Sequence, residues 1–205
     1  DTEIDFSPDQ EHRSRCLLKL LLHLQLMMNV DNIINMNFIP SWYKLWLVVS
    51  SILVVWDCLY IFYRPDTMKG GKYFQYFFPY ETYIQIDTLY GNLTDSFVVL
   101  QSQCNVVEII LVVLSMLVYA GKSIRAKSAG SLLCLVASCF TFWKTVIYVM
   151  YGYKGLVFTK GNELIVLGAF IIPTACWLVF PVLGIFAIGD RLINQIDKLK
   201  SAKQA

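Results

Sequence analysis

Three ionisable side chains stand inside long apolar stretches of this 205-residue chain. Asp57 lies within the first stretch, and Glu108 and Lys144 lie in the middle of the second and third. On membrane-insertion scales, a charged side chain at the centre of a spanning helix costs about 2.5–3.5 kcal/mol, so such groups rarely face lipid. We therefore expect all three to point into the interior of a helical bundle.

The neighbouring polar residues repeat at helical spacing. Gln101, Asn105 and Glu108 follow one another at intervals of four and three residues, which places them on one face of a helix. The third stretch carries a similar stripe, which consists of Thr141, Lys144, Thr145 and Tyr148. Both stripes are expected to face inward.

Two interpretations fit these buried charges. In the first, Lys144 pairs with Glu108 or Asp57 and only holds helices together. In the second, the groups line a polar pocket, because two carboxyl groups share a single amine and one of them is left to bind or protonate a ligand. A carboxyl group held in such a pocket can act as a general acid near neutral pH.

A fourth apolar stretch adds an aromatic candidate. Pro173 and Pro181 each free a backbone carbonyl on the preceding turn and permit a bend in the helix. Trp177 lies between them, so it either anchors the core or forms a pocket wall. The face of a tryptophan ring can also hold a cationic group of a ligand.

The apolar stretches run from about 45 to 63, 97 to 120, 131 to 151 and 164 to 188. Each is close to the roughly 20 residues that a helix needs to cross the hydrocarbon core of a bilayer. None shows the alternation of a barrel strand. The sequence predicts an all-α fold, a four-helix transmembrane bundle, in which the second span ends at Gly121 and the fourth at Gly189.

The N-terminal region is apolar over a shorter length. Residues 16–30 are interrupted by Lys19 and His23, a pattern that favours an amphipathic helix lying in the membrane interface, with a fifth span as the alternative. The chain then divides into three parts. These are an N-terminal extension over 1–40, a four-span membrane domain over 41–192 and a polar C-terminal tail over 193–205.

Basic residues set the expected orientation. The connection between the second and third spans contains Lys122, Arg125 and Lys127 and no acid, and the C-terminal tail is also basic. The positive-inside rule puts this connection and both termini on the cytoplasmic side or its equivalent. The connections over about 65–96 and 152–163 then face the other side.

The first of those connections is unusually aromatic. Its rings belong to Tyr73, Phe74, Tyr76, Phe77, Phe78, Tyr80, Tyr83 and Tyr90. A solvated loop seldom contains so many large rings, whose burial is strongly favourable. We expect this connection to fold back over the bundle as a lid.

Composition excludes several classes of function. Hydrophobic residues make up 57% of the chain and charged residues 16%, against about a quarter in soluble domains. The net charge is only +2 and the chain contains no basic run, so the sequence predicts no surface for binding nucleic acid. The six cysteines and two histidines form no metal-binding pattern, and no nucleotide-binding or hydrolase motif is present. We expect no metal and no cofactor.

Five segments together resemble the EXPERA-domain family. They read WDCLYIFYRPDTMKGG, PYETYIQIDTLYGN, QSQCNVVE, FWKTVIYVMYGY and PTACWLVFPVLGIF, and they extend over about residues 42–192. The family includes the emopamil-binding protein, which is a sterol Δ8–Δ7 isomerase, and the sigma-two receptor. The segments with R-P-x-x-M-x-G-G and W-K-T are most similar to the uncharacterised fungal-type branch.

The resemblance implies a four-helix membrane bundle with a pocket for sterols or amphipathic amines. It implies catalytic positions at Glu108 as proton donor, Asp57 as second acid or cation partner, and Trp177 as stabiliser of positive charge. The remaining candidates for contact with a ligand are Gln101, Asn105, Lys144, Tyr148 and Thr174.

Three departures separate the chain from the isomerase. The turn before Asp57 reads Ile52-Leu53-Val54 where the isomerase has a histidine, Thr174 replaces an asparagine, and Lys144 adds a positive charge.

Alternatives to isomerase activity therefore stay open. One is a receptor for amines or sterols, and another is an accessory subunit of a larger membrane complex. The resemblance implies the endoplasmic reticulum, with the mitochondrial inner membrane as the alternative. Membrane lipids or a sterol are the expected partners, with a homodimer or a membrane complex as further options and no nucleic acid.

Overall fold

The computed structural model describes Lys19 and residues 37–157 and 162–204. The predicted interfacial helix over 16–30 lies almost entirely outside these residues. The long helices are α2 (Ser41–Phe62), α6 (Ser96–Tyr119), α7 (Ile124–Gly152) and α9 (Ile172–Gln204). The shorter ones are α3 (Phe74–Phe77), α4 (Pro79–Ile86), α5 (Thr88–Gly91) and α8 (Glu163–Val166), with a 3₁₀ turn at Tyr153–Gly155 and a π-helical turn at Leu167–Ile171.

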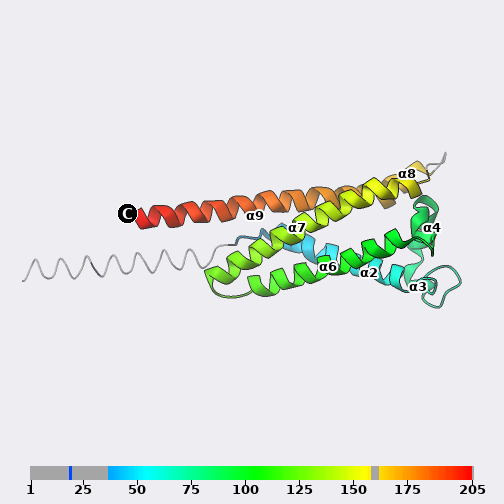
Figure 1. The fold of residues 1–205 in the computed structure, drawn as a ribbon, viewed down its shortest axis with the longest axis horizontal. Helices are drawn as coiled ribbons and strands as arrows, with labels where there is room; N and C mark the ends of the chain where they lie inside the picture. The colour runs from blue at the N-terminus through cyan, green and yellow to red at the C-terminus, as the bar shows by residue number, and fades with distance from the viewer. Residues whose placement is uncertain (1–18, 20–36, 158–161, 205) are drawn as a thin grey trace, which may run out of the picture.

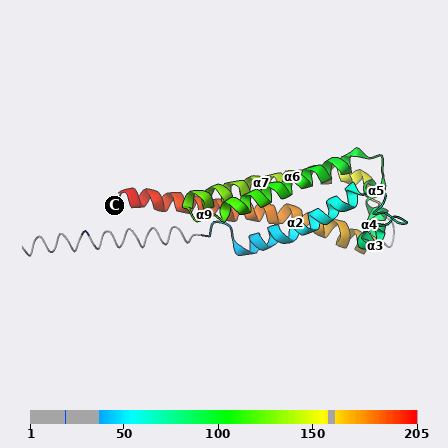
Figure 2. The same cartoon turned by 90° about the horizontal axis from the view of Figure 1, so that it is seen from below.

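The described residues form an elongated all-α bundle. Its long helices run along one axis, and α3, α4, α5 and α8 gather at one end, which we call the lid end (Figures 1 and 2). The C-terminus extends from the opposite end, which we call the tail end. In the part of the chain that is described, four helical segments are long and apolar enough to cross a membrane. This confirms the predicted four-helix fold, and the chain is an integral membrane protein.

Local signals explain where two of the spans begin. The Asp95 carboxylate accepts hydrogen bonds from the backbone N–H groups of Phe97, at 2.8 Å, and Val98, at 3.3 Å, and so caps the start of α6. The Ser123 hydroxyl accepts from Ala126 N–H at 3.1 Å and caps α7. The third span therefore begins about seven residues earlier than the apolar pattern predicts, because the basic first turns of α7 are helical as well.

The fourth helix does not end at Gly189, where the sequence predicts the end of its span. It continues through the polar tail to Gln204. No proline follows Gly189, and the tail supplies local helical pairs. The Asn194 amide donates to Asp190 at 3.0 Å, and Lys200 lies 4.0 Å from Asp197. The apolar stretch is thus shorter than the helix that contains it.

The aromatic connection folds over the lid end, as the sequence predicts. The Tyr80 ring stacks on Tyr60 of α2 with 3.7 Å between ring centroids, and Phe77 stacks on Trp56 at 5.8 Å. The Thr67 hydroxyl donates to the backbone carbonyl of Tyr60 at 2.7 Å. This hydrogen bond also ties the connection to α2. We call residues 64–95 the lid.

The third connection meets the lid at the same end. The Val157 N–H donates to the Ile86 carbonyl at 2.9 Å, and the Thr88 hydroxyl donates to the Gly155 carbonyl at 2.9 Å. The two connections that the sequence assigns to one side of the membrane therefore share one end of the bundle.

Close helix packing at the tail end forms the main core. Its buried members are Phe38, Ile39, Tyr43, Leu47, Val112, Tyr119, Cys134, Ala137 and Ile188. Gly184 of α9 lies directly against the Tyr43 ring, and Gly130 of α7 lies against the backbone of Tyr119. Small residues at helix contacts let backbones approach closely, as is common in membrane bundles. This packing leaves the lid half of the bundle to hold a cavity.

Candidate functional site

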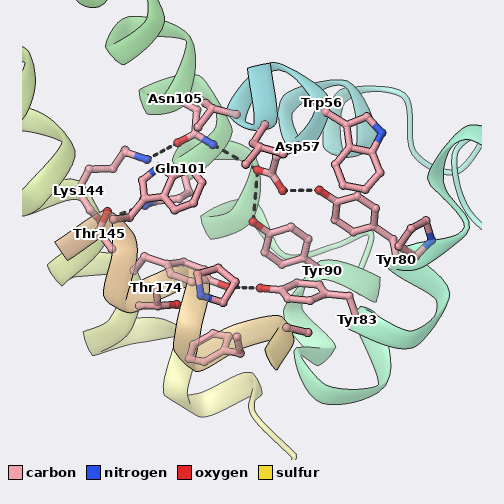
Figure 3. Close-up of a pocket in the computed structure, with 18 residues that line it drawn as sticks. Trp56, Asp57, Tyr80, Tyr83, Tyr90, Gln101, Asn105, Lys144, Thr145 and Thr174 are labelled. Carbon is pink, nitrogen blue, oxygen red and sulfur yellow. Dashed lines mark hydrogen bonds between the residues drawn. The ribbon is translucent and has the colours of Figure 1, made fainter. Parts of the chain in front are cut away.

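A cavity of ≈ 360 Å³ lies between α2, α6, α7 and the start of α9, with α4 and α5 of the lid beside it (Figure 3). This volume falls within the range of sites for small ligands, about 300–1,000 Å³. The apolar part of its wall consists of Leu53, Val54, Trp56, Pro79, Ala169, Phe170, Pro173 and Trp177. The polar part consists of Asp57, Tyr80, Tyr83, Tyr90, Gln101, Asn105, Lys144, Thr145, Tyr148 and Thr174.

Asp57 is the carboxyl group that reaches the cavity. Its oxygens accept hydrogen bonds from the Tyr80 hydroxyl at 2.8 Å, the Tyr90 hydroxyl at 3.4 Å and the Asn105 amide at 3.2 Å. The described residues include no basic side chain within ion-pair distance of it. Among the described residues, the Asp57 carboxyl group is thus hydrogen-bonded by neutral donors alone.

The two tyrosines remain donors over the whole physiological pH range. Burial in the first place, and then the charge of Asp57, raises the pKa of both Tyr80 and Tyr90 well above the ordinary value. Both rings belong to the lid, so the lid supplies two of the three hydrogen bonds that hold Asp57.

Lys144 is engaged with α6. Its ammonium lies 3.0 Å from Glu108 Oε2, and both side chains are buried, at 7% and 6% exposed. Glu108 Oε2 accepts no well-directed hydrogen bond from any described residue. Its contact with Lys144 is therefore an ion pair held by the attraction of opposite charges. Lys144 also donates to Asn105 Oδ1, and the Gln101 amide donates to the Lys144 carbonyl at 2.9 Å.

A second buried acid lies beyond the cavity wall, in the lid. Asp87 is fully buried and accepts hydrogen bonds from the Tyr148 hydroxyl and from the Leu89 N–H, the latter at 3.2 Å. Tyr148 and Tyr83 lie 2.9 Å apart, oxygen to oxygen. Burial raises the pKa of Asp87 above its ordinary value. Sequence reasoning missed this residue, although an acid just before a short helix is a typical capping signal.

The start of α9 completes the cavity. Thr174 and Trp177 lie one turn apart on this helix and both line the space. The Trp177 ring packs edge-on against Trp46 of α2, with 5.1 Å between ring centroids. The π-helical turn at Leu167–Ile171 precedes Pro173, so the backbone is irregular where it borders the cavity.

Seven of the eight residues predicted for the site share this cavity. They are Asp57, Trp177, Gln101, Asn105, Lys144, Tyr148 and Thr174. The eighth, Glu108, does not line it and instead pairs with Lys144. The two interpretations of the buried charges therefore apply to different residues. Lys144 and Glu108 form an ion pair, and Asp57 is the surplus acid in a pocket.

The arrangement offers a space walled by apolar side chains, aromatic rings and neutral polar groups, with one carboxyl group, Asp57, that is not paired with a basic side chain of the described residues. Such a site can bind a molecule whose bulk is apolar and which carries one hydrogen-bond donor or one positive charge. No protein-family model matches the chain, and neither the search of curated proteins nor that of solved structures finds a match.

Proposed function

We propose that the chain is a lipid-binding membrane protein, similar in kind to the EXPERA-domain family, whose intramembrane pocket holds a sterol or another apolar lipid by one polar group. One observation carries the proposal. Asp57 lines an otherwise largely apolar cavity with only neutral donors around it, whereas Lys144 is already paired with Glu108. A ligand that donates a hydrogen bond or carries a positive charge meets an acceptor there.

The test compares binding before and after removal of the charge. Purified protein in lipid nanodiscs is titrated with a radiolabelled cationic amphiphile and, separately, with a sterol. Asp57→Asn is expected to weaken binding of the amine about tenfold to hundredfold, the range for one charge-assisted hydrogen bond. Asp197→Asn, at the exposed end of α9, is the matched control and should bind as the wild type does. Equal binding by both variants would rule out Asp57 as the anchor.

A second candidate function is isomerisation of a ring double bond in a sterol. Trp177 and Asp57 share the cavity, which places a ring face able to stabilise a cation beside a carboxyl group. In such a reaction, a proton adds to C9 of the Δ8 bond and a cation forms at C8. Loss of a proton from C7 then leaves a Δ7 bond. Among the acids of this site, Asp57 rather than Glu108 reaches the cavity.

Conversion of a Δ8-sterol, followed by chromatography and mass spectrometry, distinguishes this candidate from simple binding. A Δ7 product that disappears in Asp57→Asn would establish an enzyme with Asp57 as its acid. A product that persists in Asp57→Asn and disappears in Glu108→Gln would return the role to Glu108. Absence of product from folded wild-type protein would leave binding as the function.

We propose the endoplasmic reticulum as the compartment, on the strength of the resemblance alone, and membrane lipids as the partners. Residence in the mitochondrial inner membrane as part of a larger complex is the alternative. Imaging of a tagged chain, together with its size in mild detergent, separates the two. Co-migration with other mitochondrial proteins would favour the accessory subunit.

A further inference from the structure

The cavity presents two charged groups of opposite sign to one ligand. Asn105 lies between them, because its Oδ1 accepts from the Lys144 ammonium and its Nδ2 donates to Asp57 at 3.2 Å (Figure 3). A single carboxamide group therefore separates the carboxylate from the ammonium. Both Asp57 and Lys144 line the cavity, so one small head group can reach both.

Glu108 decides how Lys144 acts on such a ligand. An isolated ammonium this close to Asp57 would repel a cation bound there. Glu108 lies 3.0 Å from the Lys144 ammonium and makes the pair neutral as a whole. The pair then adds no net charge to the pocket, and Lys144 acts as a strong hydrogen-bond donor rather than as a competing cation.

Lys144 retains one donor for a ligand. An ammonium has three N–H groups, and within the described part of the chain its side-chain partners are Glu108 and Asn105. Even if each of these contacts takes one N–H, a third remains, and Lys144 lines the cavity, so this N–H can donate to an acceptor oxygen there. A ligand that places an oxygen a few bonds from its ammonium satisfies both groups at once.

Building on the lipid-binding function proposed above, we propose that the pocket selects a lipid with an amino-alcohol head group. The ammonium of the 1,2- or 1,3-amino alcohol binds Asp57, and its hydroxyl oxygen accepts from Lys144. The hydrocarbon part packs against Trp56, Phe170 and Trp177. Long-chain 2-amino-1,3-diols are the lipid class with this head group and a single apolar tail.

The experiment compares three lipids with the same 18-carbon chain. Sphinganine carries the amino diol, octadecylamine the amine alone and octadecan-1-ol the hydroxyl alone. Full-length protein in phosphatidylcholine nanodiscs is titrated with each, and tryptophan fluorescence reports binding because Trp56 and Trp177 line the cavity. We expect the affinity for sphinganine to be at least about tenfold higher than that for octadecylamine. Octadecan-1-ol should bind most weakly.

Variants assign the preference to its residues. Lys144→Met is combined with Glu108→Gln, so that no unpaired charge stays buried, and this double variant should bind sphinganine and octadecylamine equally. Asp57→Asn should weaken both amines. The matched control is Lys69→Met with Glu81→Gln, which removes an exposed ion pair of the lid and should keep the preference.

Each outcome bears on one claim. Equal affinity of wild-type protein for sphinganine and octadecylamine overturns the amino-alcohol proposal without any variant, even if the double variant fails to fold. A preference that survives in the folded double variant overturns the role of Lys144. In both cases a loss of amine binding in Asp57→Asn would leave the lipid-binding function standing. If none of the three lipids binds, and the cationic amphiphile and sterol titrations also give no binding, the lipid-binding function itself fails.

Discussion

Lys144 and Glu108 face each other across two neighbouring helices, each with less than a tenth of its surface exposed. Attraction between buried charges only offsets the cost of removing them from water, so the pair contributes little net stability as it stands. The loss of one partner is different, because the other charge then stays buried without compensation. The pair therefore couples α6 to α7 in the middle of the bundle.

Lys144→Met alone should destabilise the protein by about 3–5 kcal/mol, because it leaves Glu108 buried and unpaired. Adding Glu108→Gln should recover most of the lost free energy of unfolding. Chemical unfolding in detergent micelles measures both free energies. Lys69→Met, which breaks the exposed ion pair with Glu81, is the control and should cost less than about 1 kcal/mol. A Lys144→Met protein as stable as the control would contradict the ion pair.

Asp87 makes stability depend on pH. Its pKa in the folded protein is raised by burial, so the folded state binds a proton more readily than the unfolded chain. Its contribution to stability is therefore fully present below the ordinary pKa of 3.8 and is lost as pH rises through the raised value. Asp87→Asn should reduce this dependence, and Asp66→Asn in an exposed part of the lid should not. Unfolding temperatures between pH 4 and pH 8 provide the comparison.

Among the elements, α6 and α7 lie close together where Gly130 meets Tyr119. A Cβ atom at Gly130 would lie 2.5 Å from the Tyr119 backbone nitrogen, a contact that only a shift of the helices can relieve. By contrast, a Cβ at Gly189 of α9 would meet nothing within 4 Å. Both glycines lie inside long helices, so they differ in packing and not in secondary structure.

Gly130→Ala should therefore destabilise the bundle by about 1–3 kcal/mol, the usual cost of overpacking. Gly189→Ala should be neutral or stabilising by up to about 1 kcal/mol, because alanine favours a helix over glycine. Thermal unfolding in the same detergent compares the two. A stabilised Gly130→Ala protein would mean that α6 and α7 are farther apart than the structure has them.

For the whole molecule, the lid end and the tail end should lie on opposite sides of the membrane. The lid and the third connection meet at one end through the Thr88–Gly155 and Ile86–Val157 contacts, and the basic connection between α6 and α7 lies toward the other. Positive charge favours the cytoplasmic side for the latter. The lid would then face the lumen or the cell exterior.

Lys122→Cys and Lys69→Cys test this arrangement in intact vesicles. A membrane-impermeant maleimide should label one of them from a given side, and the other only after the membrane is opened. The wild-type chain is the control, because the cysteines of its described part all lie within the long helices. Labelling of both positions from the same side would contradict a four-span topology.

The sequence by itself determined the spans and the lid. A run of about 20 apolar residues has few alternatives to a membrane helix, because hydrocarbon leaves backbone groups no partner outside the helix. The polar stripe of Gln101 and Asn105 was likewise readable, since helical spacing puts both residues on one face whatever the helix packs against. The aromatic lid followed from the strong tendency of large rings to leave water.

Only the tertiary structure decided which groups meet. Asp57 and Glu108 look equivalent in the sequence, yet Lys144 pairs with Glu108 and leaves Asp57 to the cavity. The choice depends on the rotation and depth of three helices, which local patterns do not encode. The same holds for the hydroxyl groups of Tyr80 and Tyr90, which reach Asp57 from 23 and 33 residues away. Hydrogen bonds act over about 3 Å, so only the packed fold brings such partners together.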